Sequence, residues 1–164
     1  MDHIKQILSD FPAIDLDKLD DIKLMKRYDT KFVFHKDKLK NVFDYLRISY
    51  QVLEINRHRA FKYENVYYDT DTHFFYHQHH NKKLNRYKVR QRKYVETNQS
   101  FFEIKFKNNK RKTIKNRLLL KDGQTNGKLT DESKEFAKRN VLINDSDIID
   151  QIHPSLWISF DRVT

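Results

Sequence analysis

Four stretches in the middle of the chain alternate hydrophobic and polar residues with the two-residue period of β-strands. They cover residues 60–69, 87–94, 101–107 and 111–120. In the third stretch, Phe102 and Ile104 alternate with Glu103 and Lys105, so the two pairs point to opposite faces of a sheet. Short turn-forming segments separate the last three stretches, which favours hairpins between antiparallel neighbours.

Apolar residues spaced three or four positions apart predict helices on both sides of these strands. The predicted helices cover residues 4–11, 16–25, 37–46, 130–140 and 145–152, with a helix or turn at 70–78. Thr130 is a suitable N-cap for the fourth of them. The pattern therefore predicts an α+β fold with an antiparallel sheet.

Two further stretches, 28–34 and 156–163, also show the two-residue period and are predicted to be strands. Large apolar residues at helix and strand positions are expected in the core. They are Phe32, Phe34, Phe43 and Trp157, together with the apolar stripe of the helix at 37–46.

The length of 164 residues favours one domain, residues 1–164. No apolar run is long enough to span a membrane, and Met1 to His3 begin no signal peptide, so a cytoplasmic location is expected. The absence of cysteine excludes disulfides, thiolate metal sites and cysteine nucleophiles. Only two glycines are present, which excludes the glycine-rich loops that bind nucleotide phosphates.

The positive charge is concentrated in one segment. The chain carries a net charge of +10, whereas residues 82–117 contain fourteen basic residues against two acidic ones and so carry +12. The remainder of the chain is therefore close to neutral, and a polyanionic partner is expected.

Most of these basic residues recur at strand spacing. Lys88, Arg90 and Arg92 share one face of their strand, and Lys105 and Lys115 lie on two neighbouring strands. One face of the sheet is therefore expected to be cationic, and like charges on adjacent strands repel unless an anion or water compensates them.

A solvated basic surface and a nucleic-acid-binding face are alternative interpretations of this pattern. The aromatic residues mostly alternate with the lysines and arginines along the strands, so they point to the opposite face of the sheet. Bases stacked on the aromatic rings and phosphates bound to the basic residues would therefore contact different faces. Binding of phosphate without bases fits better, and nucleic acid is not the expected partner.

Seven segments in order resemble the VTC domain, the polyphosphate polymerase domain of the triphosphate tunnel metalloenzyme superfamily, in its bacterial form. They are residues 24–32, 65–70, 79–81, 85–92, 102–105, 112–117 and 160–162. The resemblance implies an antiparallel β-barrel whose tunnel binds a triphosphate or polyphosphate together with Mn²⁺ or Mg²⁺. It also implies transfer of the terminal phosphoryl group of ATP to a polyphosphate chain.

The resemblance further implies roles for individual residues. It implies catalytic roles for Arg90, Arg92, Lys105 and Lys115, and phosphate-binding roles for Lys31, Lys88, Arg117 and Arg162. Arginine donates two parallel hydrogen bonds to phosphate, and lysine supplies a point charge.

The chain departs from the family pattern in two places. Phe160 stands where many members have tyrosine, and the family continues beyond the position of Thr164 with further strands that carry its main acidic metal ligand. A truncated barrel is therefore expected, which would either dimerise through its open sheet edges or show impaired catalysis.

Two groups of side chains leave alternatives open. Glu103 is a candidate metal ligand and also a candidate partner for Lys105 or Arg90; the second role is favoured because one carboxylate relieves repulsion among many cations. His73, His77, His79 and His80 lie near Asp69 and Asp71, although a loop is favoured there over a metal site. A metal-dependent triphosphatase and a non-catalytic polyphosphate or nucleic-acid binder remain the alternative functions.

Overall fold

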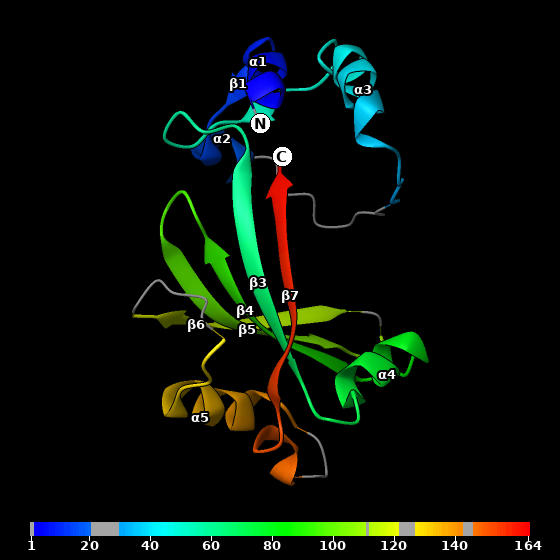
Figure 1. Cartoon of the computed structure of the whole chain (residues 1–164), viewed down its shortest axis with the longest axis vertical. Coiled ribbons are helices and arrows are strands. Elements are labelled where there is room, and N and C mark those ends of the chain that lie inside the picture. The colour runs from blue at the N-terminus through cyan, green and yellow to red at the C-terminus, as the bar shows by residue number, and fades with distance from the viewer. Residues whose placement is uncertain (1, 21–29, 111, 122–126, 143–145) are drawn as a thin grey trace. The chain divides into compact units, whose positions relative to one another are not determined.

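The computed structural model describes residues 2–20, 30–110, 112–121, 127–142 and 146–164 (Figure 1). The chain divides into two compact units, which are described separately. The first comprises Met1–Phe61 with Asp161–Thr164, and the second comprises Lys62–Phe160. No helix in the described part of the chain is long and apolar enough to cross a membrane.

The first unit is mainly helical. Its elements are α1 (Asp2–Ser9), β1 (Ala13–Ile14), α2 (Leu16–Asp20), the 3₁₀ helix η1 (Lys36–Lys38), α3 (Leu39–Leu46) and β2 (Val52–Leu53). The two short strands pair in parallel. Leu8, Phe11 and Val52 are buried at the centre of a small core, against which Phe43 and Leu46 of α3 pack. The helix predicted at 37–46 and the core role of Phe43 are therefore confirmed.

The predicted strand at 28–34 is wrong for the positions that the structure describes. Residues 30–34 form no strand, and Phe32 and Phe34 are 81% and 47% exposed rather than buried. Alternation alone does not make a strand, because a strand also needs a neighbour for its backbone hydrogen bonds. Positions 28 and 29, and the end of the predicted helix at 16–25 beyond Asp20, lie outside the described residues.

The second unit is built on a five-stranded antiparallel sheet. Its strands are β3 (Phe61–Asp69), β4 (Arg86–Tyr94), β5 (Gln99–Lys107), β6 (Thr113–Leu120) and β7 (His153–Arg162). Their order is β6-β5-β4-β3-β7, so within the described residues the sheet is open, with β6 and β7 at its edges. The four strands predicted in the middle of the chain, and the hairpins between the last three of them, are confirmed.

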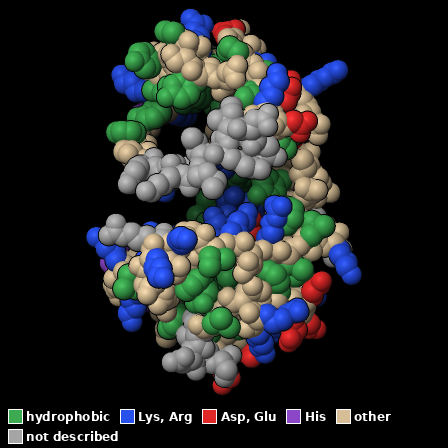
Figure 2. All heavy atoms as spheres, turned by 180° about the vertical axis from the view of Figure 1, so that it is seen from behind, with side chains coloured by type: hydrophobic (Ala, Val, Ile, Leu, Met, Phe, Trp, Pro, Cys, Tyr) green, Lys and Arg blue, Asp and Glu red, His purple; other side chains and the backbone are tan. Residues whose placement is uncertain are grey.

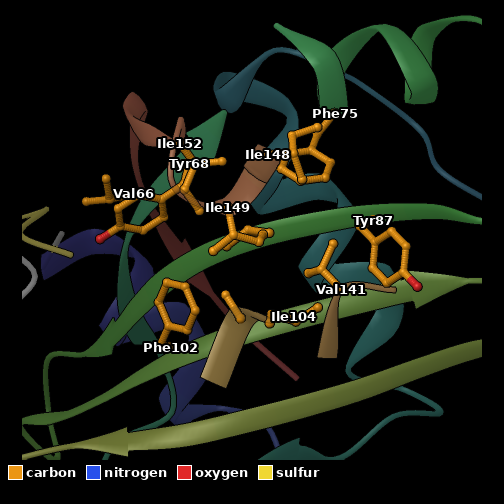
Figure 3. Packing of buried hydrophobic residues seen from close by; sticks show 12 residues of the cluster. Val66, Tyr68, Phe75, Tyr87, Phe102, Ile104, Val141, Ile148, Ile149 and Ile152 are labelled. Atoms are coloured by element: carbon orange, nitrogen blue, oxygen red, sulfur yellow. The ribbon is translucent and has the colours of Figure 1, made fainter. Parts of the chain in front are cut away.

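One face of this sheet carries the hydrophobic core (Figure 3). Phe102 and Ile104 of β5 are fully buried there, together with residues of β3 and β4. The face is covered by α5 (Asp131–Asn140) and the 3₁₀ helix η2 (Ser146–Ile149), through Ala137 and Ile149. Thr130 caps α5 as predicted, since its Oγ1 accepts a hydrogen bond from the Ser133 backbone N–H.

A short helix, α4 (Phe74–His80), follows β3. Asp69, the last residue of β3, accepts hydrogen bonds from the backbone N–H groups of Phe75 and Tyr76 at 2.8 and 2.9 Å. The carboxylate therefore caps the helix instead of standing free as a metal ligand. Among the described residues, no group of three histidine or acidic side chains is placed to hold a metal ion.

Strand β7 confirms the strand predicted at 156–163, but the expected burial of Trp157 is wrong. Trp157 is 60% exposed. The reason lies in the topology: β7 is an edge strand, and no described helix covers its outward side chains.

Candidate functional site

The register of the sheet brings the predicted basic residues together on the face opposite the core. Arg90 of β4 lies opposite Glu103 of β5, which in turn lies opposite Arg117 of β6. The next row on the same face contains Lys88, Lys105 and Lys115. The cationic face predicted from strand alternation is therefore confirmed.

Glu103 is the centre of this face. Its side chain is fully buried, and Arg90 donates to its Oε2 from Nε at 2.8 Å and from Nη2 at 2.6 Å. Lys115 Nζ lies 2.6 Å from the other oxygen, Oε1. The partner role favoured from the sequence is confirmed for Arg90, whereas Lys115 rather than Lys105 is the second partner.

The two cations determine the ionisation of Glu103. Burial alone would raise the pKa of this carboxyl, but the hydrogen bond from Lys115 and the charge of Arg90 hold its pKa below the ordinary value. Glu103 is therefore an anion at neutral pH, and it compensates part of the positive charge around it. Arg90 is further fixed by Nη1, which donates to the Tyr67 hydroxyl at 3.3 Å.

Arg92 is buried next to Arg90 on β4 but is held by different contacts. Its Nε donates to Asn65 Oδ1 at 2.8 Å, and its guanidinium carbon lies 4.8 Å from the centre of the Tyr63 ring and 5.8 Å from that of Phe160. Asn65 is itself fixed, because its Nδ2 donates to the Ile158 carbonyl at 3.2 Å. Within the part of the chain that the structure describes, the side chain is thus oriented without an anionic partner, and the N–H groups on Nη1 and Nη2 remain available to a ligand.

Lys105 lies in the middle of the second row and has no hydrogen bond or ion pair within the described residues. Burial lowers the pKa of Lys105 to about 8, and the charges of Arg90, Arg92 and Lys115 act in the same direction, against the opposing effect of Glu103. A partly buried ammonium group surrounded by cations is stabilised by a bound anion. The charge state of Lys105 is therefore expected to respond to a bound anion.

Eight cations of β4, β5 and β6 share this face with one buried carboxylate: Arg86 and Lys107, and a further six that form the cationic cluster. The six of the cluster are Lys88, Arg90, Arg92, Lys105, Lys115 and Arg117. Lys and Arg side chains gather on the surface of the second unit, where they are drawn in blue (Figure 2). Such an excess of fixed cations, projecting from rigid strands, can bind several phosphate groups through side chains alone.

Two predicted phosphate ligands lie outside the second unit. Lys31 and Arg162 belong to the first unit, where both side chains are exposed. Lys31 is also not on a strand, contrary to expectation. The site is therefore defined here by residues of the second unit.

The carboxylates of the basic face do not fit a metal site. Both oxygens of Glu103 lie against cations, and Asp69 caps α4. No other acidic side chain lies on this face of the described strands in the second unit. A divalent cation would therefore need ligands other than these side chains.

Sequence reasoning missed a pocket at the end of the basic face. It has a volume of about 470 Å³ and lies between β3, β4, α4 and β7. Tyr67, Tyr76, His79 and Leu156 line it, and Lys88 joins it to the row of lysines. Its residues come from four separate elements, so no local pattern in the sequence indicates it.

Replacing Lys105 by methionine is expected to stabilise the unliganded protein and to weaken phosphate binding. The folded pKa of about 8 lies below the unfolded value of 10.5, so the unfolded chain holds the proton more tightly. The wild-type stability should therefore rise between pH 8 and 10.5, and the variant should lack that increase. At pH 7 the variant should be more stable by about 1–2 kcal/mol, allowing for solvent screening.

Thermal melts of both proteins at pH 7 and pH 10 measure this difference. In parallel, wild-type affinity for tripolyphosphate should fall as the pH rises through about 8, because Lys105 loses its charge. A Lys105→Met variant that is less stable than wild type at pH 7 would contradict the assignment of Lys105 as an uncompensated cation.

Comparison with known families agrees with the geometry of this face. No curated protein matches the chain. The family model described as the VTC domain matches residues 26–164, which include all five strands of the sheet and every residue of the cationic cluster. The chain therefore belongs to the VTC domain family, whose function is related to polyphosphate.

Proposed function

We propose that this protein is a polyphosphate polymerase, which transfers the terminal phosphoryl group of ATP to a growing polyphosphate chain. The observation that carries the proposal is the pair of cationic rows on β4, β5 and β6, in which five cations accompany one buried carboxylate. Membership of the VTC family supports the same substrate class.

In the proposed reaction, a terminal oxygen of the polyphosphate chain attacks the γ-phosphorus of ATP. A new P–O bond forms, the bond to the β-phosphate oxygen breaks, and ADP leaves. The protein's task is to align the two phosphate chains and to neutralise their charge, as in other phosphoryl transfers. The free N–H groups of Arg92 and the ammonium groups of Lys105 and Lys115 are the groups that would do so.

We assign Glu103 a supporting role in this reaction. It holds Arg90 and Lys115 at fixed positions, and it lowers the repulsion among the cations before substrate binds. Because both of its oxygens are engaged by cations, we propose that Mn²⁺ or Mg²⁺ would be held by groups other than Glu103, where it would supply further neutralisation of phosphate charge. We also propose that the basic face forms one wall of a phosphate-binding tunnel.

Two alternatives use the same face. A triphosphatase would direct water instead of a phosphate chain at the γ-phosphorus, and a non-catalytic module would bind polyphosphate only. The dense cationic surface is compatible with each, so the products must distinguish them. The polymerase is favoured because rows of cations on three strands suit a long polyanion better than a single triphosphate.

Incubation of the full chain with ATP and Mn²⁺ tests the proposal. Long chains stained on a gel, with release of ADP, are the expected result. Free phosphate without chains would identify a triphosphatase, and neither product would identify a binder. The Arg139→Gln variant, altered on the exposed surface of α5, should retain the wild-type activity and serves as the control.

A further inference from the structure

The pocket at the end of the basic face has a lining different from that of the cationic rows. Its walls are mainly aromatic and aliphatic, with Tyr67 from β3, Tyr76 and His79 from α4, and Leu156 and Ile158 from β7. Among the described residues that line the pocket, Lys88 is the only one with a lysine or arginine side chain. The pocket therefore suits a flat, uncharged group more than a phosphate.

The His79 side chain in this wall is uncharged at neutral pH. Burial lowers the pKa of His79 to about 4, and the charges of Lys88 and Arg86 add to this effect. Arg86 Nε donates to His79 Nδ1 at 3.2 Å, which fixes the ring. A neutral, fixed imidazole beside tyrosines offers flat surfaces for stacking instead of a further positive charge.

Two residues belong to both the pocket and the cationic face. Lys88 lines the pocket and lies opposite Lys105, which lies opposite Lys115. Tyr67 also lines the pocket, and its hydroxyl accepts the hydrogen bond from Arg90. A ligand in the pocket with a polyanionic tail would therefore place the tail on Lys88 and continue across β5 toward β6.

We propose that this pocket binds the nucleoside of a nucleoside triphosphate, while the triphosphate follows the row Lys88, Lys105 and Lys115. This inference rests on the proposed function and deepens it, because it assigns an orientation to the substrate. The nucleoside lies near α4 and β7, and the terminal phosphate points toward β6. The volume of about 470 Å³ accommodates a group of that size.

Two polar groups that line this pocket are already engaged within the protein. Asp69 lines it, but its carboxylate is engaged by backbone N–H groups of α4, and the Ser155 hydroxyl donates to the His153 carbonyl at 3.0 Å. Every base presents an aromatic face, so stacking tolerates different bases. The site should therefore bind ATP and GTP with similar affinity.

Calorimetric titration of the full chain with ATP, GTP and inorganic tripolyphosphate, at one salt concentration, tests the assignment. Tyr76 is well exposed and makes no hydrogen bond through its hydroxyl among the described contacts, so Tyr76→Ala should fold. It should lose about tenfold or more in affinity for ATP and GTP, while its affinity for tripolyphosphate is unchanged. Tyr76→Phe should retain wild-type affinity, because the ring and not the hydroxyl makes the contact.

Tyr45→Ala is the matched control, since Tyr45 is an exposed tyrosine of α3 in the first unit. Equal affinities of wild type and Tyr76→Ala for ATP, or equal losses for ATP and tripolyphosphate, would overturn the nucleoside assignment alone. A wild-type chain that binds no tripolyphosphate would overturn the proposed function, and this inference with it.

Discussion

Replacing Glu103 by glutamine is expected to destabilise the protein by about 3–5 kcal/mol, the range found when one partner of a buried ion pair is removed. The substitution keeps the shape of the side chain but removes the negative charge that lies between Arg90 and Lys115. Arg90 is buried, so water cannot replace the lost carboxylate at low cost. The melting temperature should fall by about 10 °C.

Thermal unfolding with and without tripolyphosphate measures both this loss and its cause. Phosphate groups should partly replace the missing charge, so tripolyphosphate should raise the melting temperature of the variant by more than that of wild type. Acid should reduce the difference between the two proteins. The pKa of Glu103 is depressed in the folded state, so its contribution is present at neutral pH and is lost as the pH falls through that value.

Glu64→Gln provides the matched control for Glu103. Glu64 lies on β3 in the same sheet, and its partner Lys62 lies 3.7 Å away, with both side chains about 40% exposed. Loss of such a surface pair should change stability by less than about 1 kcal/mol. Equal destabilisation by the two substitutions would show that the buried ion pairs of Glu103 stabilise the fold no more than an exposed ion pair does.

Much of the second unit could be predicted from the sequence, because its strands are long and their hydrophobic and polar residues alternate strictly. The two faces of β5 can be assigned from the sequence alone, without knowing its neighbouring strands. Phe102 and Ile104 point to one face, and Glu103 and Lys105 point to the other. The register then follows from short hairpins, and it brings Lys88, Lys105 and Lys115 into one row. The cationic face was therefore predictable.

The errors concern features that depend on neighbours far away in the sequence. Phe32 and Trp157 are large and apolar, yet both are exposed, because no described strand or helix covers them. The second partner of Glu103 was also missed: Lys105 is closer in sequence, but Lys115 lies one strand away and reaches Oε1. Likewise, the pocket beside Lys88 is formed only when α4 and β7 come together.

Arg92 is expected to contribute more to phosphate affinity than Arg90, although both are buried on β4. Arg90 already uses three donors on Glu103 and Tyr67, whereas the hydrogen bonds among the described residues engage Arg92 through Nε alone, on Asn65. Arg92→Gln should therefore reduce affinity for polyphosphate by about 10- to 100-fold, the range of hydrogen bonds to charged groups. Arg92→Lys should recover only part of this loss, because lysine keeps the charge but lacks the planar fork.

Calorimetric titration with polyphosphate of defined length, at two salt concentrations, measures this effect. Arg139→Gln removes the same charge from α5, which covers the opposite face of the sheet, and should change affinity less than twofold at moderate salt. If Arg92→Gln and Arg139→Gln weakened binding equally, only the net charge would matter, and the geometry of the site would be irrelevant. A full recovery by Arg92→Lys would likewise contradict the role of the guanidinium fork, which Asn65, Tyr63 and Phe160 hold in place.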